Sequence, residues 1–146
     1  MIDIENLPKI GERSAEDILE LLGRPFKPEV IRSRRIGGKD VRYLPITAVV
    51  ERLNKSCNVW SFRILEREMI TMQLNRWDDQ AKKSQPRETA VFTVVGELTI
   101  PELGTRCGLG VQAVDPGSGE DLLKGAPADA LKKAAGLFGL WQPPLD

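Results

Sequence analysis

The feature that most constrains the fold is a strongly strand-forming segment in the second half of the chain. Residues 89–100, TAVFTVVGELTI, are dense in β-branched side chains, which suit a pleated and half-buried backbone. Residues 105–114, TRCGLGVQAV, follow after a short break and predict a neighbouring strand. Strands in hairpin order, rather than strands alternating with helices, favour an antiparallel sheet.

Three further strands are expected upstream of this pair. Residues 30–35 and 41–44 read as two short strands joined by a glycine turn. Another strand begins near Trp60 and continues to Met72 with alternating apolar and polar residues. Residues 73–88 have no hydrophobic period, so we predict a long hairpin connection or a mobile loop there.

Three helices are expected as well. Ser14 precedes a short acidic helix that ends at Gly23, and residues 46–57 carry one apolar stripe at helical spacing. The segment PADALKKAAGLFGLW predicts a C-terminal helix that starts at Pro127 and stops at Gly139, with Asp129 complementing the positive end of its dipole. Lys132 and Lys133 lie beside the apolar face of this helix.

The resulting element order predicts the fold class. A short N-terminal helix is followed by the order β-β-α-β-β-β-α, which indicates an α+β domain built on an antiparallel sheet. At 146 residues the chain suits one core, so we expect a single domain over residues 1–146.

Composition excludes several classes of function. The chain has no histidine, which removes the commonest general base, nucleophile activator and metal ligand, so we expect neither an enzyme nor a metal or other cofactor. No apolar run approaches the roughly 20 residues that span a bilayer, and the start of the chain does not resemble a secretory signal. We therefore expect a cytoplasmic protein without a membrane partner. Cys57 and Cys107 read as small buried thiols rather than a disulfide.

Charge is balanced overall but unevenly distributed. The chain has 21 basic and 21 acidic residues. Residues 1–23 hold two basic and six acidic residues, whereas residues 24–42 hold seven basic and two acidic ones. A local basic patch of this kind can neutralise phosphates even in a protein of zero net charge.

The basic patch coincides with the first predicted hairpin. Strand alternation places Arg32, Arg34 and Lys39 toward one side, with Arg35 and Arg42 on others. Several guanidinium groups on a rigid strand pair suit a phosphate backbone. The alternative is a solvated edge whose charges discourage aggregation, and the hairpin alone does not decide between them.

Other motifs favour structural roles. The sequence from Gly108 to Gly110 lacks the third glycine of a dinucleotide fingerprint and reads as strand. Asp78 and Asp79 are more typical of a solvated loop tip than of a metal site. Trp60 is expected in the core, which leaves Trp77 as the tryptophan open to base stacking.

These segments together resemble the annealing domain of the Rad52 superfamily. The similarity rests on IRSRRIGGKDVRY at residues 31–43, on the following helix with Trp60, on GLGV at 108–111, and on DALKKA at 129–134 with the later Phe-Gly pair. The superfamily includes bacterial DNA-damage-response proteins of the DdrA kind and phage Sak-type recombinases. The resemblance covers about residues 18–141.

The resemblance implies a set of DNA-binding residues. Arg34, Tyr43, Lys132 and Lys133 match positions that line the family's inner DNA groove, and Arg87 falls near its second, outer site. A further basic residue expected one turn after the lysine pair is Gly136 here, which implies either weaker binding or compensation within the hairpin. The remaining candidates are the other hairpin cations, Arg32, Arg35, Lys39 and Arg42.

The resemblance also implies an activity and an assembly. Such proteins bind single-stranded DNA and anneal complementary strands in repair and recombination, without a cofactor, as ring-shaped or helical homo-oligomers. Its implied setting is nucleoid-associated or phage-encoded in a bacterial host, with other recombination or repair proteins as partners. A rival reading, drawn from charge alone, is a protein-interaction domain whose basic hairpin pairs with the acidic N-terminal helix of a neighbouring copy.

Overall fold

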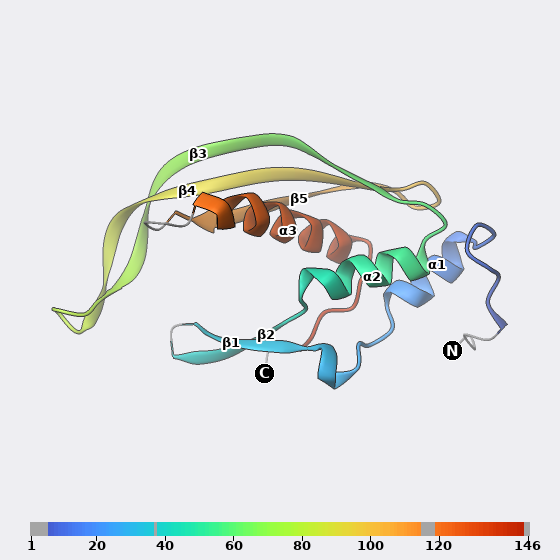
Figure 1. Ribbon diagram of the computed structural model, residues 1–146, viewed down its shortest axis with the longest axis horizontal. Coiled ribbons are helices and arrows are strands. Elements are labelled where there is room, and N and C mark those ends of the chain that lie inside the picture. Colours follow the sequence, from blue (N-terminus) through green and yellow to red (C-terminus); the bar gives the residue numbers. More distant parts are fainter. Residues whose placement is uncertain (1–5, 37, 115–118, 145–146) are drawn as a thin grey trace.

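The computed structural model describes residues 6–36, 38–114 and 119–144 (Figure 1). It is an α+β fold with antiparallel strand pairing, as the sequence predicts, and its strands form two separate sheets. In chain order the elements are α1 (Ala15–Leu22), the 3-10 turn η2 (Pro28–Val30), β1 (Arg32–Ile36), β2 (Lys39–Tyr43), α2 (Ile46–Ser56), β3 (Ser61–Asp78), β4 (Lys83–Ile100), β5 (Gly104–Ala113) and α3 (Gly119–Leu137).

The elements form layers. One sheet is the β1–β2 hairpin and the other has the order β3-β4-β5. In Figure 1, α2 and α3 lie between the hairpin and the three-stranded sheet. Among the described residues, no helix is both long enough and apolar enough to cross a membrane.

Local sequence signals explain the two N-terminal helices. The Ser14 hydroxyl accepts the Asp17 N–H at 3.2 Å and the Asp17 carboxylate accepts the Ser14 N–H at 3.0 Å, which is the predicted capping box. Helix α2 buries Val49 and Leu53 on one stripe, as its spacing predicts. Both helices therefore present one apolar face to the core.

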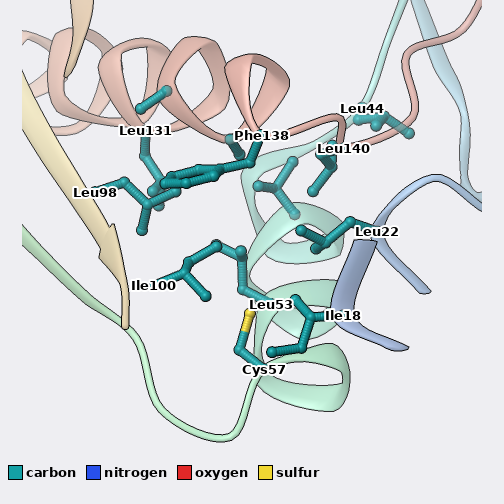
Figure 2. Close-up of a cluster of buried hydrophobic side chains, with 13 residues drawn as sticks. Ile18, Leu22, Leu44, Leu53, Cys57, Leu98, Ile100, Leu131, Phe138 and Leu140 are labelled. Atoms are coloured by element: carbon teal, nitrogen blue, oxygen red, sulfur yellow. The ribbon is translucent and has the colours of Figure 1, made fainter. Parts of the chain in front are cut away.

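The core lies where α1, α2, the end of β4 and the end of α3 meet (Figure 2). Ile18, Leu53 and Ile100 are fully buried in it. Cys57 lies in the same cluster, and burial, followed by the charge of Glu102, raises the pKa of its thiol to about 11. Cys107 is exposed, so the prediction that both thiols are buried is wrong for the second one.

The predicted loop at residues 73–88 is wrong. β3 and β4 stay paired from Ser61 to Asp78, and residues 79–82 alone form the turn. Asp78 accepts the N–H groups of Gln80 and Ala81 at 2.9 and 3.2 Å, so this aspartate shapes the turn. Since β5 pairs only as far as Val91 of β4, residues 72–89 form a two-stranded extension, here called the arm, which Figure 1 shows running beyond β5.

The tryptophans lie near their predicted settings. Trp60 precedes β3 and packs partly buried against the core, while its indole N–H donates to Asn54 at 2.9 Å. Trp77 lies on the arm with 59% of its surface exposed, and its indole N–H donates to Asp79. Among the described residues, no group of three acidic, cysteine or histidine side chains is arranged to hold a metal ion.

Helix α3 starts earlier than predicted. It begins at Gly119, so Pro127 lies inside the helix rather than in its first turn. The predicted turn at residues 115–118 lies outside the described residues. Gly139, with a φ of 100°, follows the end of the helix, close to the predicted stop.

Two glycines of β5 set the distance between the sheet and α3. A Cβ atom on Gly108 would lie 2.2 Å from the carbonyl oxygen of Ala130, and one on Gly110 would lie 1.9 Å from that of Ala126. Ala126 and Ala130 are fully buried at this contact. The close approach explains why this strand has glycine at alternate positions.

Candidate nucleic-acid interface

The β1–β2 hairpin sorts its basic residues onto two faces. Arg32 pairs with Tyr43 and Arg34 pairs with Val41, so these side chains share one face. Lys39 pairs with Ile36, two residues after Arg34, so its side chain lies on the same face, as predicted. The opposite face carries the remaining two hairpin arginines, Arg35 and Arg42.

Two cations from distant parts of the chain meet at the Tyr43 ring. The Arg34 guanidinium carbon lies 5.2 Å from the ring centroid and the Lys132 ammonium lies 5.3 Å from it. Both distances are within the range of a cation–π interaction. The ring therefore holds two positive charges close together, one from β1 and one from α3.

Lys133 is held by an acidic neighbour on its own helix. Asp129 pairs with the Lys133 ammonium at 3.0 Å and accepts the backbone N–H of Val111 at 3.1 Å. Because α3 begins at Gly119, Asp129 lies within the helix and its predicted role at the helix start is wrong. Its carboxylate instead ties α3 to the edge strand β5.

These side chains line one groove of about 650 Å³. Its walls come from the hairpin, from β5 and from α3, together with the segment after α3. It carries three cations and one carboxylate, so its net charge is positive. The lining residues are Arg34, Tyr43, Cys107, Gly108, Leu109, Asp129, Lys132, Lys133, Gly136, Leu137 and Gln142.

Burial and like charge act together on Lys132. Partial burial lowers the pKa of its ammonium group, Asp129 raises it in part, and the charge of Arg34 lowers it further. An anion bound between Arg34 and Lys132 would relieve this repulsion. The groove is therefore electrostatically prepared for a phosphate.

For a DNA strand bound along the groove, affinity is expected to fall about fourfold at physiological salt when Lys132 loses its proton. This is the factor that counterion release assigns to the loss of one phosphate contact. Because its pKa is lowered, the loss begins below the ordinary lysine value of about 10.4. Loss of this proton has the opposite effect on stability. The unfolded chain binds the proton more tightly than the folded protein does, so the free energy of unfolding rises as the proton is lost.

The measurement is anisotropy of a labelled oligodeoxyadenylate between about pH 7 and pH 9, since adenine has no proton to lose there and the reference values of lysine and tyrosine lie about one unit or more above it. Lys132→Arg is the matched variant, because its guanidinium stays charged and its affinity is expected to remain flat. An identical decline in the two proteins would exclude Lys132 as the group responsible.

The structure does not bring every predicted residue to the groove. Arg32 and Lys39 share the hairpin face with Arg34 but are not part of the groove lining. Arg35 contacts Asp40 at 3.7 Å and the Gly38 carbonyl at 3.2 Å, and Arg42 donates to the Pro144 carbonyl. Arg87 lies on the arm, 3.9 Å from the Asp78 carboxylate, and 59% of its side chain is exposed.

Several groove residues escaped the sequence analysis. Cys107, Leu137 and Gln142 contribute to the lining without a motif that marks them, and Leu109 contributes from within the GLGV segment, which was not assigned to the groove. Asp129 had a usable signal, because its spacing of four residues from Lys133 is that of a helical ion pair.

The model of the Rad52/22 family, described as double-strand break repair proteins, matches residues 14–141. The chain belongs to the Rad52/22 family. No curated protein sequence matches it. Membership places the chain in DNA repair and recombination, and the matched span runs from the cap of α1 to just beyond the end of α3. In this Rad52/22 domain the groove is formed by the same hairpin and C-terminal helix on which the sequence resemblance rests.

Proposed function

We propose that this Rad52/22 domain binds single-stranded DNA along the groove and anneals complementary strands without enzymatic chemistry. The observation that carries the proposal is the convergence of Arg34 and Lys132 on the Tyr43 ring. Two cations held together, an exposed one on β1 and a half-buried one on α3, suit an anion that repeats along a flexible strand, which is the phosphate backbone.

The groove supports a backbone-first mode of binding. Arg34, Lys132 and Lys133 neutralise phosphates and release counterions, so the bases remain available for pairing. The half-buried Tyr43 fixes the positions of two of these cations rather than reading sequence. Annealing then draws its free energy from base pairing, and the protein contributes concentration and alignment of the strands.

Three cations per subunit give modest affinity, so the proposal includes a homo-oligomer, either a ring or a helical filament. Neighbouring grooves would form one continuous path, and avidity would multiply the contacts of each subunit. Two open sheet edges support the proposed homo-oligomer. β3 and β5 each have one strand partner in the described chain, and Leu109 of β5 is 50% exposed. Arg87 on the arm is proposed as part of a second, outer DNA contact.

The rival assignment, a protein-interaction domain without DNA binding, has less support. It needs free carboxylates on α1 for the basic hairpin of a neighbouring copy. Asp17 of α1 already serves the capping box and Glu20 pairs with Arg24 at 3.5 Å. These internal roles reduce the acidic surface that the rival assignment requires.

Salt dependence of DNA binding tests the proposal. The slope of log affinity against log salt is expected to become shallower by about 0.7 in Lys132→Ala, for each subunit that the oligonucleotide contacts. Gly136→Lys is expected to steepen it by a similar amount, because Gly136 lines the groove and a Cβ there meets only the flexible end of Gln142, at 3.4 Å.

The measurement is anisotropy of a labelled single strand over a salt series, with circular dichroism to show that each variant is folded. Lys55→Ala is the matched control, because it removes one lysine outside the groove and should leave the slope unchanged. A folded wild-type protein that ignores DNA at low salt would remove the proposal in favour of the protein-interaction domain.

A further inference from the structure

A second cavity, of about 680 Å³, lies on a different part of the domain and shares no residue with the DNA groove. It is formed by the segment before α1, by the C-terminal end of α1 with the residues that follow, and by one side of α2. Its size is within the range of sites that bind small molecules or a few side chains of a partner.

Half of the cavity lining is apolar, and this part, here called the floor, consists of Leu7, Ile10, Leu21, Pro25, Phe26, Val30 and Ala48. The Phe26 ring contacts two partners: the Arg52 guanidinium lies 3.8 Å from its centroid, and the Trp141 ring centroid lies 6.0 Å away. Leu21 and Val30 contribute aliphatic surface beside it, and Ile10 is 54% exposed at the mouth. An exposed aliphatic side chain and an aromatic ring beside a cavity favour an apolar occupant.

The basic part of the lining, here called the rim, consists of Arg13, Arg24, Lys27, Arg52 and Lys55. Five basic side chains line the cavity, and Glu51 supplies the single carboxylate of the lining. Arg52 donates to the carbonyl oxygens of Leu21, Leu22 and Arg24, and Arg13 donates to those of Pro8 and Lys55. Carbonyl acceptors are neutral, so these hydrogen bonds orient the guanidinium groups without cancelling their charge.

The electrostatics of Arg52 agree with an excess of positive charge. Burial lowers the pKa of its guanidinium, and the like charge of Arg24 lowers it further. Lys55 pairs with Glu51 at 2.7 Å, so the one carboxylate of the lining already has a cationic partner. Arg24 pairs with Glu20 at 3.5 Å, a carboxylate outside the lining. Arg13, Lys27 and Arg52 supply three further cations, from before α1, from after α1 and from α2.

A buried hydroxyl lines the same cavity. Ser56 is 1% exposed, and its Oγ has no hydrogen-bond partner within the described part of the chain. An unsatisfied buried polar group lowers stability, so this hydroxyl marks a polar point in the otherwise apolar part of the lining.

We propose that this cavity is a docking site for an acidic and apolar peptide segment of a partner protein. One or two apolar side chains enter the floor beside Phe26, and neighbouring carboxylates lie against the cationic rim. Charge complementarity favours this occupant: cations from three segments suit several carboxylates, whereas a fatty acid offers one. The proposal is independent of DNA binding, because the groove and this cavity have separate linings.

The test uses the full chain and a fluorescein-labelled synthetic peptide in which aspartates flank a Leu-Phe pair. Saturable binding in the micromolar range is expected by anisotropy. Two control peptides, one with lysines in place of the aspartates and one with alanines in place of Leu-Phe, should not bind. Lys27→Glu/Lys55→Glu reverses two exposed rim charges and is expected to weaken binding at least about tenfold.

Matched variants separate the cavity from the groove. Arg34→Glu/Lys132→Glu makes the same charge change outside the cavity and should leave peptide affinity unchanged, while Lys27→Glu/Lys55→Glu should retain DNA binding. Phe26→Ala tests the floor and is also expected to weaken peptide binding. Cooperative thermal unfolding of this variant would show that it is folded.

The proposal is overturned by failure of the acidic peptide to bind, by equal binding of the lysine peptide, or by unchanged affinity in Lys27→Glu/Lys55→Glu. Displacement of the peptide by dodecanoate at stoichiometric concentration would replace the peptide with a fatty acid as occupant. A change of oligomeric state in the Lys27→Glu/Lys55→Glu variant would replace it with a second copy of this chain.

Discussion

Gly110→Ala is expected to destabilise the domain by about 3 kcal/mol or more, which is a large part of the 5–15 kcal/mol that typically stabilises a domain. The new Cβ would lie 1.9 Å from the carbonyl oxygen of Ala126 and 2.8 Å from the backbone nitrogen of Ala130. Both obstacles are backbone atoms, so no rotamer change relieves the clash. Helix α3 must move away from β5, and the contact at the buried Ala126 and Ala130 is lost.

Urea unfolding followed by circular dichroism measures this effect. Gly136→Ala is the matched control on α3: its Cβ meets only the Gln142 side chain at 3.4 Å, and alanine favours helix over glycine by about 1 kcal/mol. The control should therefore be neutral or stabilising. A Gly110→Ala protein within about 0.5 kcal/mol of wild type, the range of ordinary surface substitutions, would show that the helix–sheet distance is not fixed by this glycine.

Arg34→Glu/Lys132→Glu is expected to lower single-strand affinity and annealing rate by at least about 100-fold at physiological salt. The substitution turns a groove with three cations and one carboxylate into one with a single cation and three carboxylates. Two phosphate contacts are lost, and two repulsive charges replace them at the Tyr43 ring. In the proposed homo-oligomer the effect would grow with each subunit that shares the strand.

Annealing is measured with two complementary oligonucleotides that carry a donor and an acceptor dye. Lys27→Glu/Lys55→Glu makes an identical change of charge at the other cavity and should anneal like wild type. Thermal melts of both variants show whether the fold is retained. Wild-type annealing by the folded Arg34→Glu/Lys132→Glu protein would place the DNA site elsewhere.

Much of the fold was predictable because its signals are local. Each of three segments carries its own signal: Ser14 caps α1, one apolar stripe marks α2, and a β-branched run marks β4. The structure confirms all three elements. The arm was missed because most of its side chains on both faces remain solvated, so no hydrophobic alternation marks it as strand. Pro127 misled the prediction of α3, since an interior proline looks like a helix start.

The groove was only partly predictable. The alternation of side chains along a strand places Arg34 on one face with Arg32 and Lys39. Helical spacing places Lys132 beside the apolar face of α3. Neither pattern contains the long-range contact at Tyr43, which depends on how α3 packs on β5 and on where the hairpin lies relative to it. Only the family resemblance linked the two segments before the structure did.

The construction of the groove from two separate sheets has a mechanical consequence. Within a sheet, hydrogen bonds fix neighbouring strands about 4.8 Å apart, but in the described residues no strand ladder joins the hairpin to β5. The spacing of these two walls depends on side-chain packing, and the hydrogen bond from Arg42 to the Pro144 carbonyl ties the hairpin to the segment after α3 rather than to β5. We therefore expect this spacing to adjust more readily than the spacing of strands within one sheet, which on the proposed function would accommodate a strand whose length per nucleotide changes as it pairs.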